Sequence, residues 1–188
     1  MFPEGKYQTV KAGEVLNGLR NGLSPSTHGQ YRGNVLTLTS VTQGQFDPTY
    51  YKEGMFDIPP PQDKLVSSKD FYICRGNGNK SLVGVGVFSE TDRPDLIFPD
   101  TVIAATVDFS KICLPYLFYA WRMPNARQQI EKGAKTTNGT YKINQKLIES
   151  IEIPLPPLSA QKEFAAFIEQ LDKSVFVQIR TDTDDGRA

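Results

Sequence analysis

Several stretches of this chain alternate apolar and polar residues with the two-residue period of a strand. Residues 35–41 read Val, Leu, Thr, Leu, Thr, Ser and Val, which is typical of a strand with one buried face. Residues 71–74, 82–88 and 101–107 are rich in valine, isoleucine and aromatic side chains, which favour strands. Residues 46–63 are rich in tyrosine, proline and glycine and predict an irregular segment. Together these patterns predict a mixed sheet dominated by strands.

Shorter stretches have the apolar spacing that is typical of helices. Residues 11–20 carry valine and leucine at such spacing and predict a short helix, and residues 114–121 and 126–132 predict two more. Residues 145–150 predict a fourth short helix, and residues 151–153 predict a last strand. The expected fold class is therefore α+β, with a mixed β-sheet domain and short helices.

The longest helical pattern lies near the C-terminus. Residues 159–179 place large apolar side chains three and four positions apart, which makes one apolar stripe on a helix roughly 30 Å long. Residues 181–188 contain no large apolar side chain and predict a disordered tail. The stripe consists of Phe164, Phe167, Ile168, Leu171, Val175 and Ile179.

A proline-rich tract separates this helix from the rest of the chain. Pro154, Pro156 and Pro157 each fix φ at about −65° and lack a backbone donor, which makes the tract rigid and extended. We therefore expect a globular domain over residues 1–155 and a projecting helix over residues 156–180. The tract is expected to hold this helix away from the domain.

The composition is that of an ordinary globular protein of one domain, with 39% hydrophobic and 22% charged residues. Cys74 and Cys113 lie far apart and only His28 could add an imidazole ligand, so we expect reduced thiols and no structural metal. No apolar run approaches the ~20 residues of a membrane span, and the N-terminus lacks a signal pattern. We therefore expect a cytoplasmic protein that holds no metal or cofactor of its own.

The net charge is zero at pH 7, but the charges are unevenly distributed. Residues 122–146 carry six lysines and arginines against one acid, whereas residues 90–108 carry five acids against one arginine. We expect two surfaces of opposite sign, of which the basic one is suited to the phosphates of a nucleic acid. Solvated surface charges without a partner would show the same pattern.

Catalytic motifs are incomplete in this sequence. Gly84 and Gly86 lie in a predicted strand, not in a glycine-rich turn that opens a helix, so they do not predict a cofactor site. Residues 56–61 resemble an Asn/Asp-Pro-Pro-Tyr methyltransferase tetrad but lack its first proline and its final aromatic residue. Asp100, which follows a proline, and Asp108 with Lys111 resemble the carboxylates and lysine of a metal-dependent nuclease. Asp108 and Lys111 are three residues apart, however, whereas such a nuclease needs them two apart on one face of a strand. We expect no catalytic activity from the chain alone.

Three polar loops, over residues 24–32, 75–80 and 135–142, carry the side chains that pair with base edges. Asparagine and glutamine pair with adenine, arginine and lysine with guanine, and serine or threonine with either. Residues that only form turns or carry solvated charges would give the same composition. The sequence therefore does not show which residues of these loops contact bases. The candidate DNA-contacting residues are Ser24, Ser26, Thr27, His28, Gln30, Arg32, Arg75, Asn77, Asn79, Lys80, Lys135, Thr136, Thr137, Asn138, Tyr141 and Lys142.

The stretch from Ile153 to Glu163 resembles the IPLPP junction of type I restriction-modification specificity subunits. In that family, a DNA target-recognition domain runs into the helix of a coiled-coil spacer at this junction. A standard subunit has two recognition domains and two spacer helices, whereas this chain has one of each and resembles half a subunit or a fragment of a longer one. The similarity covers residues 10–175 and includes, in the family's order and approximate spacing, residues 21–26, 37–39, 75–78 and 135–139.

The resemblance implies that residues 1–155 recognise a DNA sequence and that residues 156–180 form the spacer helix. It further implies modification subunits that methylate adenine with S-adenosylmethionine and translocating restriction subunits that use ATP. With one spacer helix in the chain, the partner helix is expected from a second copy, which predicts a homodimer through the apolar stripe. Two alternatives remain open: a fragment of an adenine methyltransferase, and a helix-mediated protein-interaction module that does not bind DNA.

Overall fold

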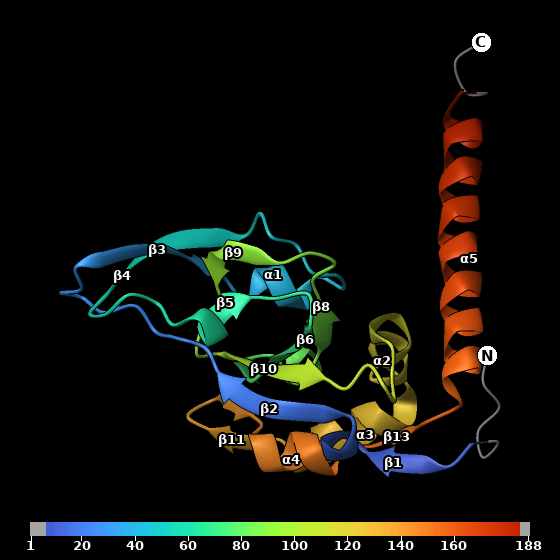
Figure 1. The fold of residues 1–188 in the computed structure, drawn as a ribbon, viewed down its shortest axis with the longest axis horizontal. Helices are drawn as coiled ribbons and strands as arrows, with labels where there is room; N and C mark the ends of the chain where they lie inside the picture. Colours follow the sequence, from blue (N-terminus) through green and yellow to red (C-terminus); the bar gives the residue numbers. More distant parts are fainter. Residues whose placement is uncertain (1–6, 185–188) are drawn as a thin grey trace.

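The computed structural model describes residues 7–184, except for the side chains of Thr137 and of residues 172–184. The described strands form four sheets with the orders β1-β13, β2-β10-β6-β8, β11-β12-β7 and β4-β3-β9-β5 (Figure 1). The strands are β1 (Thr9–Lys11), β2 (Leu16–Asn21), β3 (Tyr31–Leu36), β4 (Tyr51–Phe56), β5 (Leu65–Val66), β6 (Asp70–Cys74), β7 (Gly76–Asn77), β8 (Gly86–Phe88), β9 (Arg93–Ile97), β10 (Val102–Val107), β11 (Lys135–Thr137), β12 (Thr140–Lys142) and β13 (Glu152–Pro154). The helices are α1 (Thr39–Thr42), α2 (Leu114–Ala120), α3 (Pro124–Gly133), α4 (Gln145–Ser150) and α5 (Leu158–Asp184), and 3-10 turns lie at Ala12–Glu14, Gln62–Lys64 and Lys80–Leu82. The fold is α+β, as the sequence predicts.

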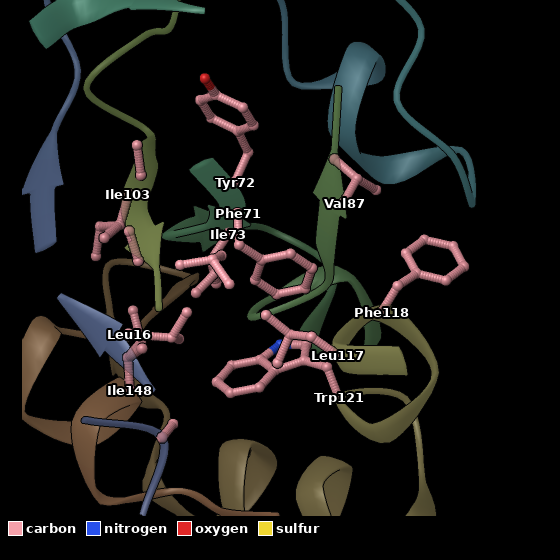
Figure 2. Close-up of a cluster of buried hydrophobic side chains, with 14 of the residues drawn as sticks. Leu16, Phe71, Tyr72, Ile73, Val87, Ile103, Leu117, Phe118, Trp121 and Ile148 are labelled. Atoms are coloured by element: carbon pink, nitrogen blue, oxygen red, sulfur yellow. The ribbon is translucent and has the colours of Figure 1, made fainter. Parts of the chain in front are cut away.

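The β2-β10-β6-β8 sheet is the central layer, with the β4-β3-β9-β5 sheet above it and α3 and α4 below it in Figure 1. Phe71 and Tyr72 of β6 point to opposite faces of this sheet (Figure 2), because side chains alternate along a strand. Phe71 packs edge-on against Trp121 with ring centroids 5.8 Å apart, and Tyr72 packs against Phe98 at 5.5 Å. All five residues of β6 are buried, so this strand joins the two halves of the core.

The indole of Trp121 also fixes the turn before β8. Its Nε1 donates to the carbonyl of Gly84 at 2.7 Å. Gly84 has a φ of +71°, and a Cβ at this position would lie 2.4 Å from the side chain of Ile130. The strand predicted over residues 82–88 therefore begins only at Gly86, because the residues before it form a turn that needs the left-handed freedom of glycine.

A charged side chain is buried in the central sheet. Asp70 is 1% exposed, and its carboxylate accepts hydrogen bonds from Arg20 at 2.5 Å and from Thr106 at 2.8 Å. The guanidinium of Arg20 also donates to the carbonyl of Asp63 at 2.7 Å. Because these bonds connect β2, β10 and β6, they hold three neighbouring strands in register.

The helix predicted over residues 11–20 is wrong. A 3-10 turn at Ala12–Glu14 is followed by β2, which pairs with β10 so that Leu16 lies opposite Val107. Leu16 is thereby buried in the core. Long-range strand pairing outweighs the helical spacing of the local sequence.

Two other sequence interpretations need correction. The strand predicted over residues 35–41 ends at Leu36 and is followed by α1, where the Ser40 hydroxyl donates to the carbonyl of Thr37 at 2.6 Å. Such side-chain bonds to the local backbone compete with sheet pairing. The segment over residues 46–63 is not irregular throughout, because it contains β4, which pairs along its whole length with β3.

The long C-terminal helix is present and runs from Leu158 to Asp184. The tail predicted over residues 181–188 is helical in its first four residues, because an established helix gains one hydrogen bond for each residue added. Residues 185–188 lie outside the described residues.

Replacing Asp70 by alanine is expected to destabilise the fold by about 3–5 kcal/mol, because the largely buried Arg20 guanidinium loses its charged partner. Urea unfolding followed by circular dichroism measures the effect. The control is Asp95→Ala, which breaks an ion pair with Arg93 whose side chains are 52% and 32% exposed and is expected to cost at most about 1 kcal/mol. Equal effects of the two substitutions would contradict the role given to the buried pair.

Candidate nucleic-acid interface

Two of the three polar loops meet in one small sheet, here called the hairpin sheet, which consists of β7, β11 and β12. In its register Tyr141 lies opposite Asn77 and Lys142 lies opposite Gly76. The polar loop expected over residues 135–142 is therefore a β-hairpin. Its turn is formed by Asn138 with φ +50° and Gly139 with φ +74°, as two-residue hairpin turns of the primed type require.

The asparagines of the hairpin sheet help to fold it. The side-chain oxygen of Asn77 accepts from the backbone N–H of Asn79 at 2.9 Å, and that of Asn79 accepts from the N–H of Ser81 at 3.0 Å. These bonds occupy the oxygens in local turns. The Lys80 ammonium lies 6.0 Å from the ring centroid of Tyr141, which connects the 3-10 turn after β7 to β12.

The candidates in the hairpin sheet differ in exposure. Arg75 is partly buried and donates to the carbonyl of Asp100 at 3.3 Å, which gives its side chain a structural contact. Asn77 and Tyr141 are half-buried, and the side chain of Thr137 lies outside the described ones. The exposed candidates are Asn79, Lys80, Lys135, Thr136, Asn138 and Lys142.

The third polar loop lies along β4. The backbone N–H of Ser26 donates to the carbonyl of Met55 at 2.7 Å, and that of Gln30 donates to the carbonyl of Phe56 at 2.8 Å. Ser24, Thr27, His28, Gln30 and Arg32 are exposed, and Ser26 is half-buried. Figure 1 shows the ends of β3 and β4 and the β11–β12 hairpin on the side of the domain away from α5. The structure thus joins two predicted loops in one sheet and places the third on a separate ribbon.

Two arginines of the basic segment bind the domain itself. The Arg122 guanidinium lies 3.4 Å from the ring centroid of Phe118 and donates to the carbonyl of Gly44, and burial lowers its pKa. Arg127 donates to the carbonyl of Val83 at 3.0 Å. The exposed cations of this segment are therefore its lysines, Lys132, Lys135, Lys142 and Lys146.

Part of the acidic segment lies at the other end of the central sheet. Asp108 follows β10, whereas the start of β10 pairs with the end of β6 that leads into the hairpin sheet. Asp92 accepts from the backbone N–H of Ser68, just before β6 begins, at 2.7 Å. These two carboxylates are separated from the exposed lysines of the hairpin sheet by the length of the central strands.

The nuclease-like residues do not form a site. Asp100 precedes β10 and Asp108 follows it, so a six-residue strand of about 20 Å separates them. Hydrogen bonds from Ser110 and Lys111 lower the pKa of Asp108, which makes it a weak base. Among residues 7–184, no three His, Cys, Asp or Glu side chains lie close enough to hold a metal ion.

The cysteines and the helices add no further chemistry. Both cysteines are free, and burial raises the pKa of the Cys74 thiol to about 11. A thiol with such a pKa is a poor nucleophile at neutral pH. In the described part of the chain, no helix is both long and apolar enough to span a membrane.

The first turns of α5 pack against the domain, so the expectation that the prolines hold the whole helix away is wrong. The ring of Phe164 lies 5.9 Å from that of Tyr116 and 5.5 Å from that of Tyr119, both in α2. The Tyr116 hydroxyl donates to the carbonyl of Pro154 at 2.8 Å. Beyond these contacts, Figure 1 shows α5 continuing past the domain.

The apolar stripe therefore has two parts. Phe164 contacts the domain and Ile168 is half-buried, whereas Phe167 and Leu171 are 53% and 45% exposed. The side chains of Val175 and Ile179 lie outside the described ones.

Gln161 fixes the junction and was missed by sequence reasoning. It is fully buried, its Oε1 accepts from the backbone N–H of Cys113 at 3.0 Å, and its Nε2 donates to the carbonyls of Lys111 and Pro156 at 2.9 and 2.8 Å. A polar residue three positions before Phe164, on the apolar side of the helix, was the available signal.

Comparison with known proteins identifies the domain. A model of the type I restriction modification DNA specificity domain matches residues 101–181, which include the β11–β12 hairpin, the proline tract and most of α5. The specificity subunit of the type I restriction enzyme EcoKI from Escherichia coli (strain K12) is 31% identical over 168 residues. This match covers 88% of the chain and 36% of that subunit.

Solved structures share the fold. The crystal structure of the HsdS subunit from Thermoanaerobacter tengcongensis matches with a TM-score of 0.69 at 17% identity, over 97% of this chain and 46% of that chain. A chain from a structural study of complex assembly in the type I R-M system matches with a TM-score of 0.64 at 16% identity. The match covers 98% of this chain and 44% of that chain. The matches to the specificity-domain model and to the E. coli subunit confirm the resemblance to type I restriction-modification specificity subunits seen in the sequence. The chain spans about a third of the length of the E. coli subunit.

Replacing Gln161 by leucine is expected to destabilise the protein by about 1–3 kcal/mol, because one N–H and two carbonyls at the junction lose their partner. Urea unfolding measures the change. The matched control is Gln128→Leu on the exposed face of α3, which is expected to change stability by at most about 0.5 kcal/mol. A Gln161→Leu variant as stable as the wild type would contradict the role of Gln161 in fixing α5 to the domain.

Proposed function

We propose that this chain is a DNA target-recognition module of a type I restriction-modification system, without catalytic activity of its own. The observation that carries the proposal is the hairpin sheet, in which two polar segments far apart in the sequence meet. Its exposed lysines are suited to phosphates, and its exposed Thr136 and Asn138 are suited to base edges. The match to the specificity-domain family supports the same conclusion.

The proposed partners are double-stranded DNA, a modification subunit and a restriction subunit. S-adenosylmethionine for adenine methylation and ATP for translocation would be bound by these subunits, and the chain would supply specificity. The assembly would act in the cytoplasm. The relationship to a subunit of the EcoKI restriction enzyme supports this assignment.

We further propose that residues 1–155 form the recognition domain and that residues 156–180 act as a spacer through which two copies pair. Phe167 and Leu171 support this pairing, because they are large apolar side chains that stay largely exposed on α5. Antiparallel pairing would cover them and place two recognition domains at opposite ends. A symmetric dimer of this kind would read an interrupted palindrome.

Replacing Lys135 and Lys142 together by alanine is expected to weaken binding to all duplexes alike. The slope of log K against log salt should fall by about one unit for each lost phosphate contact. Fluorescence anisotropy with a labelled duplex of random sequence, repeated over a series of salt concentrations, measures both quantities.

The matched control replaces Lys69 and Lys111 by alanine. Both lysines are also exposed, but they lie at the ends of β6 and β10 that face away from the hairpin sheet. This control should leave affinity and slope close to the wild-type values. Unchanged binding in the Lys135/Lys142 variant would place the footprint elsewhere. A wild-type chain without salt-dependent DNA binding would favour the protein-interaction module, and a methylase motif in the flanking gene would favour the methyltransferase fragment.

Replacing Phe167 and Leu171 by aspartate is expected to give a folded monomer. The new charges would be buried without partners at the interface between the two α5 helices. Sedimentation velocity at tens of micromolar measures the oligomeric state. The control is Ala166→Asp, an exposed position on the opposite side of α5, which should leave the dimer intact. A monomeric wild-type chain would refute the dimer.

A further inference from the structure

The β3–β4 ribbon presents a charged surface that is separate from the hairpin sheet. β9 pairs with β3 only at Asn34 and Val35, so residues 31–33 pair with 54–56 of β4 but not with β9. These six residues form a two-stranded ribbon. Figure 1 shows it extending past the central sheet, on the side away from α5. The major groove of B-DNA is wide enough to admit a ribbon of this kind.

The two faces of the ribbon have different surroundings. Side chains directly opposite each other share a face, and successive side chains alternate. Val35 and Phe56 occupy one face and are buried with Ile97 in a small cluster. Leu36 occupies the other face and is buried in the main core with the central sheet. Arg32 shares the face of Leu36 but lies four residues further out, where the core no longer covers it.

Arg32 and Glu53 lie together on this outer face. Their charged groups are 3.4 Å apart, and the two side chains are 72% and 65% exposed. An ion pair so exposed contributes little to stability, so the fold does not require it. The pair combines a planar donor with an acceptor on one exposed face of β3 and β4.

This combination matches the major-groove edge of one base pair. Guanine presents two acceptors, N7 and O6, and the cytosine paired with it presents an amino donor beside them. An arginine donates to both guanine acceptors, and a glutamate accepts from the cytosine amino group. Neighbouring arginine and glutamate side chains therefore complement a G·C pair, whereas an A·T pair offers neither the second purine acceptor nor the pyrimidine donor.

We propose that Arg32 and Glu53 together read one G·C base pair of the target in the major groove. The inference rests on the proposed function and assigns base reading to the ribbon and phosphate contacts to Lys135 and Lys142. Glu53 has a role here that sequence reasoning did not assign. In the free protein the ion pair holds both side chains over the same face of the ribbon.

The test is selection of bound duplexes from a random library by the wild-type chain, assembled with its modification subunit, and by Arg32→Ala and Glu53→Ala variants. Each variant is expected to lose a G·C preference at one and the same position and to keep the rest of the motif. Affinity for the wild-type site should fall roughly 5- to 150-fold for Arg32→Ala. Arg32→Lys should also lose the preference, since lysine keeps the charge but not the planar fork.

The matched control is Lys52→Ala, which removes a charge from the other face of β4 and should leave the selected motif unchanged. Unchanged motifs in the Arg32 and Glu53 variants would refute the inference while leaving the proposed function intact. Equal weakening on all sequences, with rescue by Arg32→Lys, would also refute it, because Arg32 would then contact a phosphate. A wild-type assembly that selects no motif would overturn the proposed function itself.

Discussion

The complete burial of β6 is the constraint on which the rest of the structure depends. Phe71 against Trp121 on one face and Tyr72 against Phe98 on the other tie both outer layers to this strand. Its end continues through Arg75, whose backbone N–H donates to the carbonyl of Thr101 at 2.8 Å and whose carbonyl accepts from Ile143 at 2.9 Å. The hairpin sheet is therefore attached directly to the core, and its polar side chains are held on a fixed support.

The elements that sequence predicted correctly are those whose own residues carry the apolar signal. The strands at residues 71–74 and 101–107 were found because nearly every side chain in them is buried. The β11–β12 hairpin was missed because its residues are polar and its pairing with β7 depends on contacts far away in the sequence. For the same reason the three candidate loops could be proposed as a group, but their division between the hairpin sheet and the β3–β4 ribbon could not.

The junction shows how a proline tract can fix an orientation as well as provide a spacer. Prolines lack donors but keep their carbonyls, and those of Pro154 and Pro156 accept hydrogen bonds from Tyr116 and Gln161. Phe164 then adds aromatic contacts one turn further along α5. The direction of α5 is thus set by the same core that supports the hairpin sheet. In a dimer paired through α5, the distance between two recognition surfaces would follow from this junction.

The zero net charge is compatible with DNA binding because of where the charges lie. Arg122 and Arg127 bind carbonyls of the domain, which leaves lysines to face the solvent at the hairpin sheet. A few lysines would supply a modest, salt-sensitive affinity that is the same for every sequence. With so little non-specific attraction, occupancy of a site would depend on base contacts and on partner subunits. A domain that contributes specificity to a larger assembly has reason to keep its own phosphate affinity low, because each extra phosphate contact would strengthen binding to every competing sequence equally.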